Sequence, residues 1–237
     1  MNDIKILYED DDILVLDKPA GITVNKSDTT KGDYTVQDWI ENNFKFQISN
    51  LKLNQGSDFY GRAGIVHRID KETSGILLVV KNLKAFENLQ SQFKERKVKK
   101  TYAALVHGEV KPDEGEIKVP VGRLPWNRKR FGVLAGGKEA ATKYKVIKRM
   151  KGYTLLELNP ETGRTHQIRV HLKYINHPIF ADYLYAGRKT SRDERKVLDR
   201  VFLHAQKISF YHPKTGELIS FESPLPEELT NVLISLN

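Results

Sequence analysis

Cysteine is absent from the sequence of 237 residues. Its absence excludes disulfide bonds, a thiolate nucleophile, and zinc or iron–sulfur sites with cysteine ligands. No apolar run approaches the ~20 residues that a transmembrane helix requires. The N-terminal residues lack the basic stretch and the following apolar stretch that are typical of a signal peptide. We therefore expect a soluble protein of the cytoplasm that does not contact a membrane.

Sequence patterns of common cofactor and metal sites are absent as well. The segment 135–138 lacks the first glycine and the final Ser/Thr of a phosphate-binding P-loop, and neither G-x-G-x-x-G nor H-E-x-x-H occurs. His166 and His171 look like a metal-binding pair, but five residues correspond to ~140° around a helix and to opposite faces of a strand. We expect all seven histidines to be structural or hydrogen-bonding, and we expect no metal and no cofactor.

Positive charge is in excess, because 39 Lys and Arg residues face 30 Asp and Glu residues, which gives a net charge of +9. An excess of this kind concentrates polyanions near the protein surface, and nucleic acid is the most common polyanion that such a protein meets. The same charge could also serve solubility alone. Charge by itself therefore leaves nucleic-acid binding open.

Hydrophobic residues make up 39% and charged residues 29% of the chain, which is typical of a globular protein and excludes a disordered or fibrous one. Runs rich in aliphatic and β-branched residues predict strands, and apolar residues at helical spacing predict helices. The expected strands cover residues 13–16, 76–80, 101–106, 116–121, 141–147 and 153–158. The expected helices cover 35–44, 83–93 with Asn82 as its cap, and 165–175, while 45–62 is expected to be a loop.

This order of elements predicts an α+β fold with a mixed, mainly antiparallel central sheet and flanking helices. Short strands that follow one another without regular alternation with helices are typical of that class. The sequence contains no internal repeat and no Gly/Ser linker, so we expect one continuous domain that covers residues 1–237.

One expected loop, residues 122–131, combines basic and aromatic side chains. Its basic residues can contact phosphates, and its aromatic rings can stack on unpaired bases. The alternative is a solvated loop with its tryptophan anchored in the core. The interleaving of the two kinds of residue favours RNA contact. The residues concerned are Arg123, Trp126, Arg128, Lys129, Arg130 and Phe131.

The segment His67–Gly75 joins the expected loop to the buried strand 76–80 and contains Asp70 between Arg68 and Lys71. Nearby positive charge holds a carboxylate in its ionised form. An ionised aspartate where a loop enters a strand can act as a nucleophile or as a base. An aspartate in a basic turn can equally form an ion pair or a cap.

The segment 161–172 has a glycine turn that leads into an expected helix with Arg164 and Arg169. Arg169 could bind a carboxylate or a phosphate with two parallel hydrogen bonds. The alternative is a helix face with solvated arginines. Taken from their residue types alone, these two segments leave their roles open.

His67–Lys71 followed by Thr73-Ser74-Gly75 resembles the active-site motif of the RluA-type pseudouridine synthases. Other segments resemble the same family in the same order, and together they extend from about residue 8 to residue 226. Many members carry an additional RNA-binding S4 domain before the catalytic domain, whereas here we expect the catalytic domain alone. The further matching segments are Asp17–Gly21, Lys100–Tyr102, Thr162–Arg169, His177–Ile179 with Asp182, Leu203–Ala205 and His212-Pro213.

The resemblance implies that Asp70 is the catalytic aspartate for a uridine in RNA. The uracil leaves at N1, turns within the site and rejoins the ribose through C5, which requires no cofactor. The resemblance also implies that Tyr102 packs on the target base, although as a residue of an expected strand it could belong to the core. Arg169 is implied to pair with Asp70, and Arg68 to enter the RNA in place of the flipped uridine.

The expected substrate is therefore a stem-loop of ribosomal or transfer RNA, and we expect the enzyme to be a monomer. The basic loop 122–131 and Arg164 are expected to hold the RNA around its target. Two other hypotheses remain at this point. One is a non-catalytic RNA-binding protein that uses the same basic face, and the other is a metal-dependent hydrolase with scattered histidines and aspartates.

Overall fold

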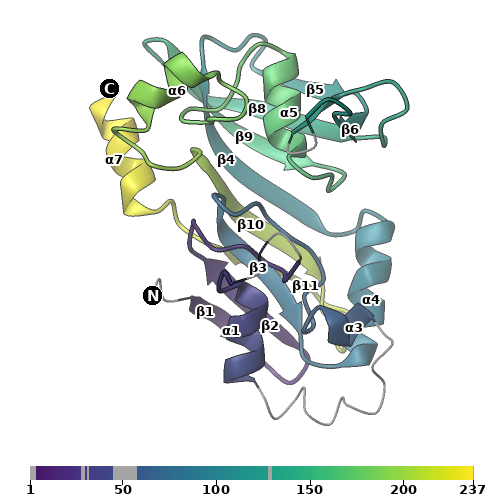
Figure 1. Ribbon diagram of the computed structural model, residues 1–237. Coiled ribbons are helices and arrows are strands. Elements are labelled where there is room, and N and C mark those ends of the chain that lie inside the picture. Colours follow the sequence, from purple (N-terminus) through teal and green to yellow (C-terminus); the bar gives the residue numbers. More distant parts are fainter. Residues whose placement is uncertain (1–3, 28–29, 31, 45–57, 128–129, 237) are drawn as a thin grey trace. The chain divides into compact units, whose positions relative to one another are not determined.

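A computed structural model describes residues 4–27, 30, 32–44, 58–127 and 130–236, and Figure 1 shows its elements. The chain divides into two compact units. The first consists of Met1–Val98 with Lys207–Ser223, and the second of Lys99–Gln206 with Pro224–Asn237. Strand β10 (Leu203–Tyr211) contributes residues to both units.

The first unit contains a sheet with the order β1-β2-β3-β10, and β11 pairs with β10. The pairs β1–β2, β2–β3 and β10–β11 are antiparallel, and the β2–β3 register runs from Ile13 opposite Val80 to Lys18 opposite Gly75. The strands are β1 (Lys5–Glu9), β2 (Ile13–Lys18), β3 (Ser74–Val80) and β11 (Leu218–Glu222). The helices are α1 (Val36–Asn43), α3 (Asp58–Gly61) and α4 (Leu83–Lys94).

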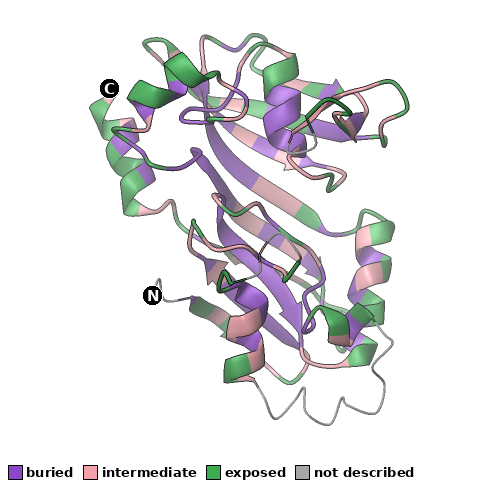
Figure 2. Ribbon diagram, in the orientation of Figure 1, coloured by how far each residue is buried: buried purple, intermediate pink, exposed green. Residues whose placement is uncertain are grey.

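The core of the first unit lies between this sheet and α4, and Figure 2 shows β2 and β3 buried along most of their length. Helix α4 begins at Asn82, whose side chain accepts a hydrogen bond from the Ala85 N–H at 2.9 Å. Its apolar side then buries Phe86 and Leu89 against the strands. Full burial of a side chain of this size contributes ~1.5–3 kcal/mol relative to exposure.

The second unit has the strand order β10-β4-β9-β8-β5, and its pairs β4–β9, β8–β9 and β5–β8 are antiparallel. A separate hairpin joins β6 and β7. The strands are β4 (Lys99–His107), β5 (Glu114–Lys118), β6 (Val121–Arg123), β7 (Phe131–Val133), β8 (Ala141–Met150) and β9 (Tyr153–Pro160). The helices are α5 (Gln167–Tyr174), α6 (Arg188–Glu194) and α7 (Glu227–Ser235).

One face of the strands β4, β9 and β8 carries both Tyr102 and helix α5. Tyr102 of β4 lies opposite Leu158 of β9, which lies opposite Tyr144 of β8. Residues directly across a sheet share a face, as do residues two apart in one strand, so Thr142 is on this face too. Gln167 of α5 donates a hydrogen bond to Thr142 Oγ1 at 3.0 Å, which places the helix there.

The predicted α+β class is confirmed, with mainly antiparallel pairing and helices beside the strands. The strand predicted over 116–121 is wrong, because two strands, β5 and β6, lie on either side of Pro120, which has no N–H for a strand ladder. The loop prediction for 45–62 missed α3, and 45–57 lie outside the described residues. Within the described part of the chain, every helix is too short or too polar to cross a membrane.

Candidate active site

Asp70 is half-buried and begins the turn that leads into β3. Its backbone carbonyl accepts a hydrogen bond from the Thr73 N–H at 3.1 Å. The next carbonyl, that of Lys71, accepts a hydrogen bond from the Gly21 N–H at 2.8 Å. The turn that carries Asp70 is therefore held through its backbone.

Lys18 at the end of β2 fastens this turn to the segment 19–22. The side chain is completely buried, and its ammonium donates to the carbonyls of Pro19 at 2.8 Å, Ile22 at 2.9 Å and Lys71 at 3.2 Å. A buried charge is tolerated only when its hydrogen-bonding capacity is satisfied. This role of Lys18 is not apparent from the sequence, in which the match of Asp17–Gly21 to the family is its only signal.

The segment before Asp70 is fixed against β3 in a similar way. His67 Nε2 accepts a hydrogen bond from the Leu78 N–H at 2.9 Å, and its ring lies 5.2 Å from the ring of Phe93. Gly64 accepts from the Val80 N–H at 2.9 Å, and a Cβ at this glycine would clash with the Val80 carbonyl oxygen. Both sides of Asp70 are thus attached to the core of the first unit.

Arg68 is exposed and, within the described part of the chain, makes no hydrogen bond or ion pair. Lys71, on the other side of Asp70, lies 3.4 Å from a carboxylate oxygen of Asp33, and both side chains are exposed. An exposed ion pair of this kind typically stabilises a fold by only about 0–1 kcal/mol, because water and salt screen the two charges. Among the described residues, the guanidinium of Arg68 beside this turn thus has donors without an acceptor.

Arg169 on α5 is only 6% exposed and forms a two-point ion pair with Asp182. Its Nε donates to Oδ2 at 2.7 Å and one terminal nitrogen donates to Oδ1 at 2.9 Å. Asp182 is completely buried and also accepts from the N–H groups of Leu184 at 3.0 Å and Tyr185 at 3.2 Å. Asp182 therefore fixes the orientation of the Arg169 guanidinium. Asp182 matches the family in sequence, but its pairing with Arg169 is not apparent from the sequence alone.

Tyr185 connects α5 with the β6–β7 hairpin. The Arg169 guanidinium lies 5.0 Å from the centre of its ring and that of Arg130 lies 5.5 Å from it. The hydroxyl accepts from the Phe131 N–H at 3.1 Å and lies 2.9 Å from His166 Nδ1. Because one side chain contacts both elements, the hairpin and Arg169 share a support.

The basic loop between β6 and β7 has its tryptophan in solvent, since Trp126 is 76% exposed. The alternative in which Trp126 is anchored in the core is therefore wrong. The Arg123 guanidinium lies 4.9 Å from the ring centre of Phe131, and the Leu124 N–H donates to the Arg130 carbonyl at 3.0 Å. Two further residues predicted to bind RNA, Arg128 and Lys129, lie outside the described residues.

Tyr102 is buried on β4, on the sheet face that α5 covers. Arg164 is exposed, and its Nε donates to the Glu139 carbonyl at 3.0 Å. The predicted residues thus fall into two groups. Asp70 and Arg68 belong to the first unit, and the second unit holds Tyr102, Arg123, Trp126, Arg130, Arg164 and Arg169.

The two histidines that look like a metal pair in the sequence have separate hydrogen-bonding roles. His171 is completely buried, with Nδ1 at 2.9 Å from Thr142 Oγ1 and Nε2 at 3.1 Å from the Val119 carbonyl. Burial lowers the pKa of His171, which keeps the ring neutral for these two bonds. His166 contacts Tyr185 instead. The prediction that these two histidines are hydrogen-bonding residues is confirmed.

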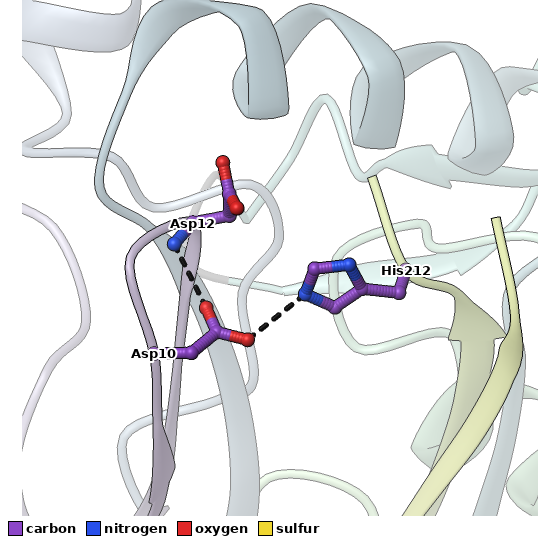
Figure 3. Close-up of side chains that lie close together, drawn as sticks. All are labelled: Asp10, Asp12 and His212. Carbon is purple, nitrogen blue, oxygen red and sulfur yellow. Dashed lines mark hydrogen bonds and ion pairs between the residues drawn. The ribbon is translucent and has the colours of Figure 1, made fainter. Parts of the chain in front are cut away.

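Asp10, Asp12 and His212 approach one another closely enough to be considered as metal ligands (Figure 3). Asp10 accepts hydrogen bonds from the Asp12 N–H at 2.8 Å and from His212 Nε2 at 2.9 Å. The other nitrogen of His212 accepts from the N–H groups of Lys214 and Thr215 at 3.2 Å each. These atoms already have partners, and the contacts tie the turn before β2 to the turn after β10.

Comparison with known proteins agrees with this architecture. A model of the family described as RNA pseudouridylate synthase matches residues 12–174. The uncharacterized RNA pseudouridine synthase YlyB of Bacillus subtilis is 41% identical over 234 residues, which cover 99% of this chain and 73% of that protein. The ribosomal large subunit pseudouridine synthase D of Nitrosomonas europaea is 39% identical, and the match covers 97% of this chain and 64% of that protein.

Among solved structures, human RNA pseudouridylate synthase domain containing 1 matches with a TM-score of 0.72 and 25% identity, over 94% of this chain and 84% of that chain. None of these matches supports a metal-dependent hydrolase or a non-catalytic binding protein. The matches in sequence and in fold agree with the motifs around Asp70 and Arg169. The chain belongs to the RNA pseudouridylate synthase family as an RluA-type enzyme, an isomerase that converts uridine in RNA to pseudouridine.

Proposed function

We propose that this enzyme forms pseudouridine in ribosomal RNA of the large subunit. The observation that carries this choice is the name of several relatives, two of which are 39% and 40% identical and are called ribosomal large subunit pseudouridine synthase D. The chain spans 64% and 60% of those proteins, so the assignment concerns the part of each that it matches.

Asp70 is proposed as the catalytic carboxylate, acting on the ribose of the target nucleotide when the bond between C1′ and N1 breaks. Either direct attack on C1′ or removal of a ribose proton requires the ionised form. The bonds from Gly21 and Lys18 to the Lys71 carbonyl support this role, because they hold the turn in one conformation before RNA binds. A preorganised group avoids the entropy loss of ordering it during the reaction.

Arg169 and Tyr102 are proposed as the partners of Asp70 in the reaction. A guanidinium has two edges that can each bind a carboxylate, and Asp182 occupies the edge that includes Nε. The other edge of Arg169 is proposed to bind Asp70 and to keep it ionised. The ring of Tyr102, on the same sheet face as α5, is proposed to pack on the target base and to keep water from the detached uracil.

The RNA is proposed to contact Arg68 and the basic side of the β6–β7 hairpin. Arg68 is exposed and lies two residues before Asp70, which suits a side chain that replaces a flipped base. Trp126 offers an exposed ring for stacking. The remaining RNA-contacting residues of this proposal are Arg123, Arg128, Lys129, Arg130 and Arg164.

The reaction itself adds and removes no atoms and involves no change of oxidation state. We therefore propose that it proceeds without metal or cofactor, with residues 1–237 as a single catalytic domain. The enzyme is further proposed to act as a monomer in the cytoplasm. We therefore expect the enzyme to be active in excess chelator and to sediment as a particle of 27.2 kDa.

Release of tritium from RNA labelled at C5 of uridine tests the proposal, because joining the base through C5 expels the hydrogen that C5 carried. Large-subunit ribosomal RNA, small-subunit ribosomal RNA and transfer RNA are supplied separately to the wild type and to Asp70→Asn. We expect release from the first RNA by the wild type alone. Release only from transfer RNA would contradict the substrate, and free uracil in place of pseudouridine would contradict the isomerisation.

A further inference from the structure

Lys100 is a lysine on β4 to which the roles proposed so far assign no task. It precedes Tyr102 by two residues in the same strand, so both side chains point to the face that α5 covers. The residue as a whole is partly exposed, but its ammonium lies deep enough that burial lowers the pKa of Lys100 to about 8. Burial of an ammonium group costs free energy, because the group loses its hydration.

Among the described residues, the Lys100 ammonium has few hydrogen-bond acceptors. Its one hydrogen bond is a long one of 3.4 Å to the Thr162 carbonyl, and no carboxylate of the described residues forms an ion pair with it. Lys18, the other buried lysine, has three carbonyl acceptors at 2.8–3.2 Å. Lys18 is satisfied by backbone carbonyls, whereas Lys100 has donor capacity that the described residues leave unused.

The elements that surround Lys100 are held together by hydrogen bonds of their own. Asn159 Nδ2 donates to Thr101 Oγ1 at 3.1 Å, which fixes the strand. The Thr162 hydroxyl donates to Gln167 Oε1 at 2.6 Å, which fixes the turn before α5. A Cβ at Gly163 would lie 4.0 Å from the Lys100 Nζ, so the ammonium sits beside the bare backbone of this turn.

The reaction produces negative charge at the base. When N1–C1′ breaks, its electron pair goes to N1, and the uracil becomes an anion whose charge spreads to O2 and O4. The bond C5–C1′ then forms, the hydrogen at C5 leaves as a proton so that the ring regains its C5=C6 double bond, and N1 gains a proton, which leaves the isomer neutral and of unchanged composition. The phosphates that flank the target nucleotide are permanent anions. Residues on one strand face lie about 6.5–7 Å apart, a span that a lysine side chain can cover from Lys100 to a base on Tyr102.

We propose that the Lys100 ammonium binds an anionic oxygen of the target nucleotide, either on a flanking phosphate or on the detached uracil. The proposal rests on the placement of the target base against Tyr102 in the proposed function. Lys100 takes no proton in this role and remains an ammonium throughout. A preorganised charge in a water-poor site stabilises an anion far more than it would in bulk water.

The test uses Lys100→Met, which keeps the length of the side chain without its charge, and Lys100→Arg, which keeps a charge that does not titrate. Rates are measured in single turnovers at saturating RNA, and RNA affinity is measured over a range of salt concentrations. We expect Lys100→Met to lose at least tenfold in rate or in affinity and Lys100→Arg to stay within a few-fold of the wild type. Lys99→Met, an exposed lysine on the other face of the same strand, is the matched control and should change neither.

The two sources of the anionic oxygen give different results in this experiment. A phosphate contact lowers RNA affinity and reduces the salt dependence by about one counterion, with the saturated rate unchanged. A contact to the detached uracil lowers the saturated rate with affinity unchanged, because that charge appears only after the bond has broken. Rates and affinities of Lys100→Met within twofold of the wild type would overturn the proposal.

A second contradiction would come from a folded Lys100→Arg that is as slow as Lys100→Met, since that would mean that a neutral amine, and not a charge, is needed. Thermal unfolding separates these outcomes from misfolding. Lys100→Met should unfold at the same temperature as the wild type or higher at pH 7, because a lowered pKa means that folding disfavours the charged form. Tyr102→Leu is measured in parallel. If it leaves the rate unchanged, the placement of the base fails, independently of the result for Lys100.

Discussion

The two compact units hold their proposed catalytic groups by different kinds of contact. In the first unit, the turn of Asp70 is held by hydrogen bonds to its backbone, from Gly21 and from the ammonium of Lys18. In the second unit, the guanidinium of Arg169 is held by side chains, namely the carboxylate of Asp182 and the ring of Tyr185. The contacts that hold the turn of Asp70 thus involve its backbone, whereas those that hold Arg169 involve its side chain.

This difference determines which substitutions separate activity from stability. A substitution of Asp70 removes the charge that the reaction needs and leaves the backbone contacts of the turn, so we expect it to affect the rate far more than the stability. A substitution of Lys18 or Asp182 removes a buried partner, so it should affect stability and rate together. The following substitutions are ordered by their expected effect on the rate.

Asp70→Asn should reduce the rate of pseudouridine formation by at least about a thousandfold, because the amide keeps the shape of the side chain and removes its charge and basicity. The melting temperature and RNA affinity should stay close to those of the wild type. Single-turnover tritium release measures the rate, and circular dichroism measures unfolding. A rate within a few-fold of the wild type would contradict the role of Asp70.

Lys18→Met should lower the free energy of unfolding by ~2–4 kcal/mol, because three backbone carbonyls lose the donor that joins them. It should also reduce the rate about a hundredfold, because a shift of the turn by ~1 Å misplaces Asp70. Urea unfolding and single turnovers are the measurements. Lys5→Met on exposed β1 is the matched control, and equal unfolding midpoints for the two variants would contradict the role of Lys18.

Elements with a continuous apolar run or with apolar residues at helical spacing could be predicted from the sequence, whereas the very short and polar elements, and some longer ones such as β10 and α7, were missed. β2 and β3 were predicted from their continuous apolar runs, and α1 and α4 from apolar residues at helical spacing, with Asn82 as the cap of α4. α6 was missed because its sequence RKTSRDE is almost entirely polar, and β7 because it has only three residues. The missed elements are β1, β7, β10, β11, α3, α6 and α7.

Residues of the candidate site could be predicted only where they belong to a sequence motif of the family. Asp70 and Arg169 were found through the family motifs that contain them. Lys18 was missed because its acceptors are backbone carbonyls, which any residue supplies and which leave no trace in the sequence. The burial of Lys100 depends on how β4 meets the turn before α5, and the pairing of Asp182 depends on how the chain returns after α5.

Asp182→Asn should reduce the rate about 10–100-fold and the free energy of unfolding by ~3 kcal/mol, because it leaves the buried charge of Arg169 without its counter-charge. The double variant Arg169→Met with Asp182→Leu should recover part of that stability, since no buried charge remains, but none of the rate. A double variant that is less stable than Asp182→Asn would contradict this account of the pair.

Tyr185→Phe should have the smallest effect, because it removes the hydroxyl and keeps the ring that the Arg169 guanidinium contacts at 5.0 Å. The lost hydrogen bonds to Phe131 and His166 should lower the free energy of unfolding by about 1 kcal/mol and weaken RNA binding a few-fold, since they steady the hairpin. The saturated rate should not change. Amide hydrogen exchange at Phe131 should become faster, which measures directly how often the hairpin opens.

Tyr185→Leu removes the ring as well and should lower the saturated rate, because Arg169 then loses its support. If Tyr185→Phe slows the saturated reaction as much as Asp182→Asn does, then the hydroxyl network, and not the ring, holds Arg169 in place.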